Sequence, residues 1–320
     1  MTQSKIAAIA IGRNEGERLV ACLASLKGRT HPVIYVDSGS TDGSVDAAKA
    51  AGAEVVTLDL SVPFTAARAR NAGLARLSEI DREGAYVQFL DGDCALREGW
   101  IEAALAEIET DPKIAVVCGR RRERFPEASL WNRLADIEWD TPVGEATACG
   151  GDALMRRAAL DEVGGYRGDL IAGEEPEMCF RMRRNGWRIV RIDAEMTWHD
   201  AAMTRLSQWW KRNRRAGHAY AESAALHGGS PERFRVPETR RIVLWGLMLP
   251  LAALPGAVVT PWALLLLLAY PAQMLRLRAR GEPWARAVFL VLGRFAEARG
   301  VLDYRAARAL GKKRGLIEYK

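Results

Sequence analysis

Short apolar runs alternate with amphipathic stretches from residue 5 to about residue 120, and this alternation restricts the possible folds more than any other feature of the sequence. Each apolar run has the length of a strand and is rich in Val, Ile or aromatic residues, as expected of a strand covered on both faces. We therefore predict an α/β fold with a mostly parallel sheet and helices on both faces. The predicted strands are residues 6–11, 33–36, 54–58, 86–90 and 114–118, and the predicted helices are residues 17–26, 44–50, 66–77 and 101–109.

Beyond residue 120 the alternation weakens and the segments become more basic and aromatic. We expect helices over residues 126–140, 176–185 and 206–226, an extended piece over residues 148–155 and a last strand over residues 187–192. The five cysteines are scattered and contain no Cys-x-x-Cys pair, so neither a disulfide framework nor a structural zinc site is indicated, and a reducing cytosol is the simpler location. The first apolar run is too short for a secretory signal peptide.

An uncharged stretch runs from Ile242 through Leu275, with basic residues on both flanks. One helix of that length would reach roughly 50 Å, well past a hydrocarbon core of about 30 Å, and Pro and Gly residues interrupt it. We expect two short passes that meet near residues 256–261, with both ends on the cytoplasmic side. A buried helical pair in a soluble core and a shallow re-entrant hairpin are the alternatives. Residues 284–295 suit a helix in the membrane interface, and Lys312-Lys313-Arg314 add attraction to anionic lipid.

Polar clusters follow several predicted strands, at the strand ends where parallel sheets bind ligands. Asp91-Gly92-Asp93 places two carboxylates one residue apart, and such hard oxygen ligands suit Mg²⁺ or Mn²⁺ beside a diphosphate. Asp37 can accept hydrogen bonds from a base or a ribose. Structural roles compete with these, because Asp-Gly-Asp is a common turn sequence and Asp42 can cap a helix.

Three further segments carry groups with a chemical and a structural interpretation. Arg70 can reach a phosphate or lie on a solvated helix face. Glu174, Glu175 and Glu177 can favour a helix N-terminus or supply a general base. His199 is either a metal ligand or a hydrogen-bonded structural residue. The residue types alone leave each pair of alternatives open.

Seven segments of the chain, in this order, resemble the inverting glycosyltransferases of family 2, which have the GT-A fold. The resemblance covers roughly residues 5–215. The matching segments are Ile11-Gly12-Arg13-Asn14-Glu15, Val36-Asp37-Ser38-Gly39-Ser40-Thr41-Asp42, Ala69-Arg70-Asn71-Ala72-Gly73, Phe89-Leu90-Asp91-Gly92-Asp93, Gly150-Gly151-Asp152-Ala153-Leu154-Met155, Gly164-Gly165-Tyr166 and Gly173-Glu174-Glu175.

The resemblance implies a role for each matching position. The catalytic base falls on Glu175, where the family has an aspartate, and Glu174 is the second candidate. Asp37 would hold the base of the nucleotide, and uracil is a natural donor to that carboxylate. The implied metal ligands are Asp93, Asp91 and His199 for Mg²⁺ or Mn²⁺. The implied donor-binding residues are Asn14, Glu15, Asp37, Arg70, Asn71, Asp91, Gly151 and Asp152.

These implications predict a metal-dependent, inverting glycosyltransferase of hexosyltransferase type. It would move a sugar from a nucleotide-sugar, with a UDP-sugar favoured, to a hydroxyl of a lipid-linked or envelope-polysaccharide acceptor by single displacement. The alternatives are a sugar-1-phosphate nucleotidyltransferase and a membrane-tethered nucleotide-sugar-binding protein without activity.

The same reasoning predicts how the chain is organised and where it works. Residues 1–230 would form the GT-A domain, residues 231–280 a membrane-associated hairpin and residues 281–320 a basic amphipathic segment. The expected partners are the donor, the acceptor and membrane lipids, and not nucleic acid, because the basic residues crowd beside the uncharged stretch. The expected location is the cell inner membrane, with the catalytic domain on the cytoplasmic side.

Overall fold

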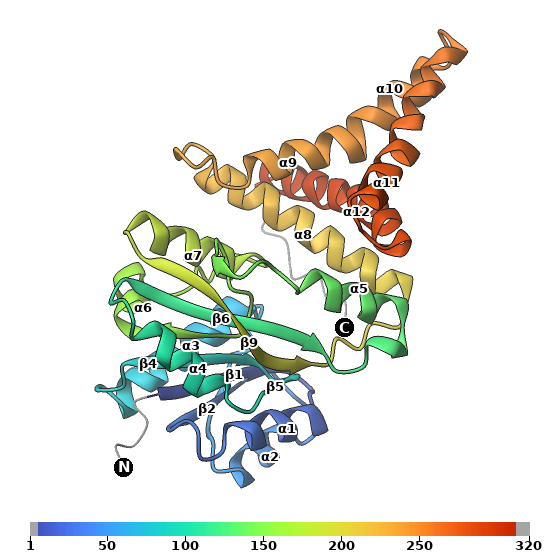
Figure 1. Ribbon diagram of the computed structural model, residues 1–320. Helices are drawn as coiled ribbons and strands as arrows, with labels where there is room; N and C mark the ends of the chain where they lie inside the picture. The colour runs from blue at the N-terminus through green and yellow to red at the C-terminus, as the bar shows by residue number, and fades with distance from the viewer. Residues whose placement is uncertain (1–5, 312–320) are drawn as a thin grey trace. The chain divides into compact units, whose positions relative to one another are not determined.

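The computed structural model describes residues 6–311 and divides the chain into two compact units, one up to Ala202 and one from Met203 onward. The first unit contains a nine-stranded sheet with helices around it, and the described part of the second unit is helical (Figure 1). This division falls before the predicted boundary near residue 230, because the helix that begins at Leu206 packs with the later helices. The predicted Lys312-Lys313-Arg314 cluster lies outside the described residues.

The sheet of the first unit is mostly parallel, as the alternation in the sequence predicts. Its strand order is β3-β2-β1-β4-β8-β6-β9-β5, and β7 pairs with β9. β8 runs antiparallel to β4 and β6, and β5 and β7 run antiparallel to β9. The strands are β1 (Ile6–Gly12), β2 (Val33–Asp37), β3 (Glu54–Thr57), β4 (Tyr86–Asp91), β5 (Cys94–Leu96), β6 (Ile114–Glu123), β7 (Gly144–Glu145), β8 (Ala153–Arg156) and β9 (Arg188–His199).

The order of the strands creates a switch point between β1 and β4. From β1 the chain steps in one direction to β2 and β3, and α3 then carries it back past β1 to β4. Right-handed crossovers that move in opposite directions put their helices on opposite faces, and ligands bind at the carboxyl ends of the strands at such a point. The helices of this unit are α1 (Glu17–Leu26), α2 (Ser44–Ala50), α3 (Ala66–Ile80), α4 (Trp100–Ile108), η1 (Pro126–Ala128), α5 (Leu130–Glu138), α6 (Arg157–Val163) and α7 (Glu174–Arg184).

The core of the first unit lies around β1 and β4, whose apolar side chains are almost completely buried. Gln88 is a polar residue in the middle of β4 and is fully buried. Trp100 of α4 donates its indole N–H to Gln88 Oε1 at 2.8 Å, and the Gln88 amide donates to the carbonyl of Phe89 at 2.8 Å. Because an unpartnered buried amide is costly, these bonds fix α4 against the sheet.

The first seven elements, from β1 to β4, were predicted to within a few residues, and the larger differences lie farther along the chain. The predicted strand over residues 187–192 is β9, which continues to His199. The polar run Asp193-Ala194-Glu195 hides this continuation in the sequence. β5, β7 and α6 were not predicted, because each is too short to show a hydrophobic period.

The second unit is held together by helices that approach each other through glycine. A Cβ atom at Gly217 of α8 would overlap the carbonyl of Glu297, and one at Gly300 of α12 would overlap the carbonyl of Arg214. The two backbones therefore touch, which only a residue without a side chain permits. The helices are α8 (Leu206–His227), α9 (Val236–Val243), η2 (Leu244–Met248), α10 (Leu249–Gly256), η3 (Pro261–Leu268), α11 (Ala269–Ala279) and α12 (Trp284–Ala309).

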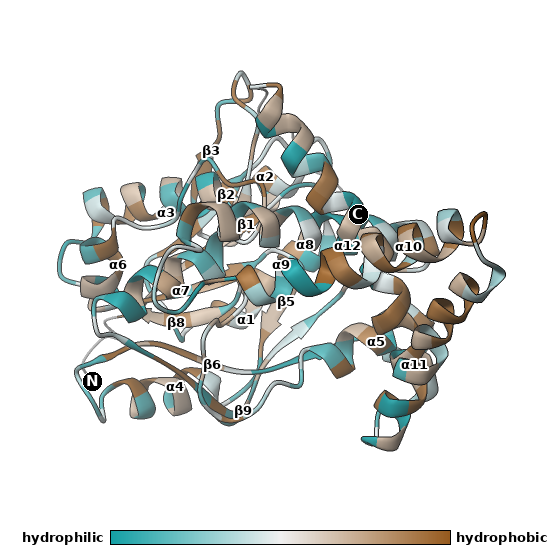
Figure 2. Cartoon of the chain, turned by 90° about the horizontal axis from the view of Figure 1, so that it is seen from above, coloured by the Kyte–Doolittle hydropathy of each residue, from teal (hydrophilic) through white to brown (hydrophobic). Residues whose placement is uncertain are grey.

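The uncharged stretch forms two helical arms that turn back on each other after Gly256 (Figure 1). Val258, Val259 and Trp262 at the turn are 89%, 88% and 76% exposed, and this part of the chain is brown in the hydropathy view of Figure 2. Among residues 6–311, however, no helix combines the length and the apolar character that crossing a bilayer demands. A membrane-spanning hairpin is therefore not supported.

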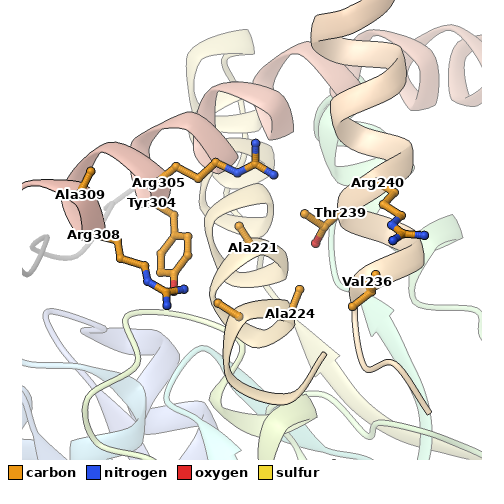
Figure 3. Close-up of a pocket in the computed structure, with 10 residues that line it drawn as sticks. Ala221, Ala224, Val236, Thr239, Arg240, Tyr304, Arg305, Arg308 and Ala309 are labelled. Carbon is orange, nitrogen blue, oxygen red and sulfur yellow. The ribbon is translucent and has the colours of Figure 1, made fainter. Parts of the chain in front are cut away.

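A cavity of about 660 Å³ lies between α8, α9 and α12 of the second unit (Figure 3). Ala221 and Ala224 of α8 form an apolar part of its wall, and Arg240, Arg305 and Arg308 contribute cationic side chains. Within residues 6–311 none of these three arginines forms an ion pair with a carboxylate. The cavity therefore offers uncompensated positive charge beside apolar surface.

Candidate functional site

The Asp91-Gly92-Asp93 turn lies at the switch point of the sheet. Asp91 ends β4 opposite Ile11 of β1, and the N–H of Gly92 donates to the carbonyl of Ile11 at 2.7 Å. A Cβ atom at Gly92 would lie 3.1 Å from the Glu15 side chain and 3.2 Å from that carbonyl, so the turn is tight against β1. The two aspartates therefore reach the ligand-binding edge that the topology predicts.

Asp93 and His199 come together although they are far apart in the sequence. β5 pairs with β9 so that Cys94 lies opposite His199, and Asp93 Oδ2 lies 3.3 Å from His199 Nε2. Both side chains are buried, and the ring of Trp139 packs edge-on against the imidazole at 4.6 Å between centroids. Asp93, Cys94 and His199 each offer a ligand atom within this group.

The protonation of His199 suits metal binding. Burial, aided by the nearby Arg121 cation, lowers the pKa of His199 to about 4, so the imidazole is neutral near pH 7. Its Nδ1 atom is buried and has no hydrogen-bond partner among the described residues. A carboxylate beside a neutral imidazole is a donor set that binds divalent cations, so these residues fit the predicted metal.

Arg70 joins Asp91 at the end of β4 to Glu174 at the start of α7. Its guanidinium is buried and pairs with Asp91 Oδ1 and with Glu174 Oε1, each at 2.8 Å. A Cβ atom at Gly151 would lie 2.7 Å from Asp91 Oδ2 and 2.9 Å from Arg70 Nη2, so the backbone at Gly151 closes over this pair. Arg70 therefore has a structural role here, and Glu174 is committed to an ion pair.

Asp152 is a buried residue that holds the neighbouring residues of this region in place through hydrogen bonds and an ion pair. It is fully buried, and its Oδ1 accepts the backbone N–H of Asp91 at 3.1 Å. Its Oδ2 accepts the hydroxyl of Thr197 at 3.0 Å and lies 3.1 Å from Arg121 Nε. In this arrangement Asp152 orients Asp91 and Arg121, and protein groups enclose the carboxylate that was predicted to face the donor.

Asn14 and Asp37 tie together the loops that follow β1 and β2. Asp37 pairs with Gly12 in the sheet, and its carboxylate accepts the N–H groups of Gly39 and Ser40, each at 2.9 Å. Asn14 has a positive φ of 56° and accepts the N–H of Thr41 at 2.7 Å. These hydrogen bonds hold the two loops together at the carboxyl ends of β1 and β2.

Glu15 and Asn71 also make contacts within the protein. Glu15 pairs with Arg18 at 2.8 Å. The Asn71 amide donates to the carbonyl of Tyr166 at 2.7 Å and accepts the Tyr166 N–H at 2.9 Å. Asn71 thus clamps the loop that precedes α7.

Glu175 is a buried carboxylate at the first turn of α7. Its Oε1 accepts the backbone N–H of Cys149 at 2.6 Å, the Cys149 thiol at 3.1 Å and the Cys179 thiol at 3.0 Å. Burial, the hydrogen bond with Cys179 and the charge of Glu175 raise the pKa of Cys149 well above its usual value, so the thiol stays protonated and donates. The second oxygen, Oε2, has no hydrogen bond to another residue within the described part of the chain.

Four residues at this site were not predicted from the sequence: Arg121, Trp139, Cys149 and Cys179. A signal for Cys179 exists, because it follows Glu175 by four residues on one helix and so faces it. The contacts of Cys149, Arg121 and Trp139 arise only from tertiary packing. Sequence spacing therefore finds the acids of the site but not the groups that hold them.

Comparison with known proteins shows which sequences and folds this chain resembles. Residues 9–164 match the model of the family described as Glycosyl transferase family 2. The chain is 29% identical over 230 residues to a pre-mycofactocin glycosyltransferase of Mycobacterium tuberculosis, covering 67% of this chain and 46% of that protein. It is 23% identical over 189 residues to the glycosyltransferase AglE of Haloferax volcanii, covering 55% and 60%. The chain thus spans about half the length of the curated relatives it matches.

Two solved structures share the fold. The mannosyltransferase PcManGT of Pyrobaculum calidifontis, solved with GDP-Man and Mn²⁺, superposes with a TM-score of 0.63 at 19% identity and covers 94% of this chain and 88% of that one. A mycobacterial protein gives a TM-score of 0.50 at 20% identity, covering 70% and 74%. At these identities the likeness concerns the fold, which is α/β and GT-A-like with a mostly parallel sheet. The match to the Glycosyl transferase family 2 model covers residues 9–164, and the remaining residues lie outside that match.

Proposed function

We propose that the protein transfers a sugar from a nucleotide-sugar to an acceptor hydroxyl, with inversion and with help from a divalent cation. The observation that carries this proposal is the buried Asp93–His199 pair at the switch point of the sheet. The network of Arg70, Asp91 and Glu174 connects this pair to the helix that bears Glu175. A leaving-group site and a base therefore belong to one assembly. The two curated relatives are glycosyltransferases by name, which supports the same activity here.

The chemistry follows from the roles of the chain's own residues. Glu175 Oε2 removes the proton of the acceptor hydroxyl as that oxygen attacks the anomeric carbon from the face opposite the nucleotide. Hydrogen bonds from Cys149 and Cys179 hold Oε1 and so aim Oε2. Asp93 and His199, with Asp91, would hold Mg²⁺ or Mn²⁺, which when bound offsets the charge of the diphosphate. A single displacement of this kind inverts the anomeric configuration.

Metal removal tests the proposed activity directly. The full chain is incubated with a panel of UDP- and GDP-sugars and Mn²⁺, and release of nucleoside diphosphate is measured. We expect turnover with at least one donor, a UDP-sugar by preference, and a loss of at least about 100-fold when a chelator removes the metal, restored by added Mn²⁺. If the chelator leaves the rate of turnover unchanged, the proposed divalent-cation site is contradicted.

The same assay separates the two other functions. A sugar-1-phosphate nucleotidyltransferase would release pyrophosphate from a nucleoside triphosphate instead of nucleoside diphosphate from a sugar donor. A binding protein without activity would shift its melting temperature with a nucleotide-sugar and release nothing. Nucleotide release with sugar transfer therefore favours the proposed function over both.

We also propose that the second unit rests on a lipid surface and that the acceptor is lipid-linked or an envelope saccharide. The supports are the exposed apolar turn with Val258, Val259 and Trp262 and, elsewhere in the same unit, the cavity arginines, which form no ion pair within residues 6–311. Apolar side chains that enter a headgroup layer beside cations bind anionic membranes. The cytoplasmic side of the cell inner membrane is the location that this proposal assigns.

A charge placed at the apolar turn should weaken membrane binding. In flotation with vesicles that contain an anionic phospholipid, we expect the wild type to float and Val258→Asp/Val259→Asp to lose most of its vesicle-bound fraction. The matched control is Val143→Asp, which changes an exposed valine of the first unit. Equal flotation of all three proteins would show that the turn makes no contact with lipid.

A further inference from the structure

Cys149, Glu175 and Cys179 form a second group of metal-ligating residues, distinct from Asp93 and His199. Cys149 lies on the loop before β8, and Glu175 and Cys179 are one helical turn apart on α7. The two sulfur atoms are 3.9 Å apart, and Glu175 Oε1 lies 3.1 Å from Cys149 Sγ and 3.0 Å from Cys179 Sγ. All three ligand atoms belong to one compact group that offers two thiols and a carboxylate.

These separations are close to those of a tetrahedral thiolate site. With Zn–S bonds of about 2.3 Å and angles of about 109°, two sulfur ligands are about 3.8 Å apart. A Zn–O bond of about 2.0 Å puts the oxygen about 3.5 Å from each sulfur. The sulfur pair already has this spacing, and the carboxylate needs to withdraw by only about 0.5 Å. Small side-chain rotations therefore suffice to admit an ion.

The chemistry of the donors selects the type of ion. Thiolate sulfur prefers thiophilic cations, whereas Mg²⁺ and Mn²⁺ prefer oxygen ligands. All three members of the group are buried at their ligand atoms, although Cys149 as a whole residue is half-buried. A water molecule would supply the fourth ligand of a tetrahedral ion. The two thiol protons leave to solvent as the thiolates coordinate the ion.

We propose that Cys149, Cys179 and Glu175 bind Zn²⁺ or another thiophilic divalent cation, and that the bound ion inhibits sugar transfer by occupying Glu175. The inhibitory part rests on the proposed function of Glu175 as the base, whereas the binding part stands without it. Two separate measurements therefore decide the two parts.

Binding is tested by titrating the full chain with Co²⁺ in a thiol-free reductant, with excess Mg²⁺ present to occupy oxygen-rich sites. We expect one equivalent of Co²⁺ to give the near-ultraviolet thiolate-to-metal charge-transfer absorption and the visible bands of tetrahedral Co²⁺, and Zn²⁺ to abolish both. Cys149→Ser/Cys179→Ser should lose the charge-transfer absorption. The matched control, Cys22→Ser, removes a buried thiol on α1 and should keep it. Absence of the absorption in the wild type, or its persistence in the double variant, overturns the site.

Inhibition is tested in the Mn²⁺-supported transfer assay by adding Zn²⁺ in steps. Each protein is compared with its own rate without Zn²⁺, and circular dichroism with thermal unfolding verifies that the double variant is folded. We expect the inhibitory Zn²⁺ concentration to rise at least about tenfold in Cys149→Ser/Cys179→Ser, because thiolate ligands dominate the affinity. Equal inhibition of both proteins overturns the inhibitory part. A wild type without transfer would refute the proposed function and leave the Co²⁺ result to decide the binding site.

Discussion

Replacement of Glu175 with glutamine is expected to lower sugar transfer by about 10²–10⁴-fold, the range typical of losing a general base. The amide keeps the size of the side chain, and its carbonyl oxygen can still accept the N–H of Cys149 that now donates to Oε1. It cannot take a proton from the acceptor hydroxyl. The measurement is the turnover number under saturating donor and Mn²⁺, with donor affinity followed separately.

Two further variants make this result specific to the base. Glu127→Gln changes a carboxylate that is 83% exposed and should transfer sugar at the wild-type rate. Glu174→Gln removes one of the two carboxylate partners of buried Arg70, so we expect a lower melting temperature together with reduced activity. If Glu175→Gln keeps activity within about twofold of the wild type while Glu174→Gln is inactive at full stability, Glu174 is the base instead.

Replacement of Asp93 with asparagine is expected to lower Mn²⁺ affinity and turnover by at least about 100-fold. The side chain keeps its shape, but it loses the negative charge that a divalent cation needs beside neutral His199. Titration calorimetry with Mn²⁺ reports the affinity, and nucleoside diphosphate release reports the turnover.

The control for this variant is Asp161→Asn, which changes a carboxylate that is 68% exposed on α6 and should leave both quantities unaltered. Thermal unfolding of Asp93→Asn must resemble that of the wild type for the loss to be assigned to the metal. Full turnover in a folded Asp93→Asn protein would remove Asp93 from the site.

The sequence was most informative where a single strand or helix determines the position of a residue. Asp37 and Asp91 come at the ends of buried apolar strands, so the sequence located both strand ends. Because β2 and β4 run parallel in the sheet, the two aspartates lie at the same edge. The antiparallel insertion of β8 between β4 and β6 could not be foreseen, because register between distant strands depends on tertiary packing. His199 lies beside Asp93 because β5 pairs with β9, and no local sequence pattern predicts that pairing.

The partners of the predicted acids were also beyond the reach of sequence patterns. Arg70 was considered as a phosphate ligand or a surface residue, yet it is buried between Asp91 and Glu174. The cysteines were counted only for disulfides and zinc motifs, yet two of them donate to Glu175. An acidic residue in a sequence shows that a negative charge is present, but the tertiary structure determines which groups lie beside that charge.

The glycine contacts between α8 and α12 make the two helices interdependent in evolution. Because Gly217 and Gly300 each face a carbonyl of the opposite helix, a methyl group at either position would push the backbones apart and loosen the other contact. A substitution at one position therefore becomes acceptable only after the spacing of the helices has been reset elsewhere. Homologues that lack these glycines should carry compensating changes along both helices, so that the pair diverges as one unit.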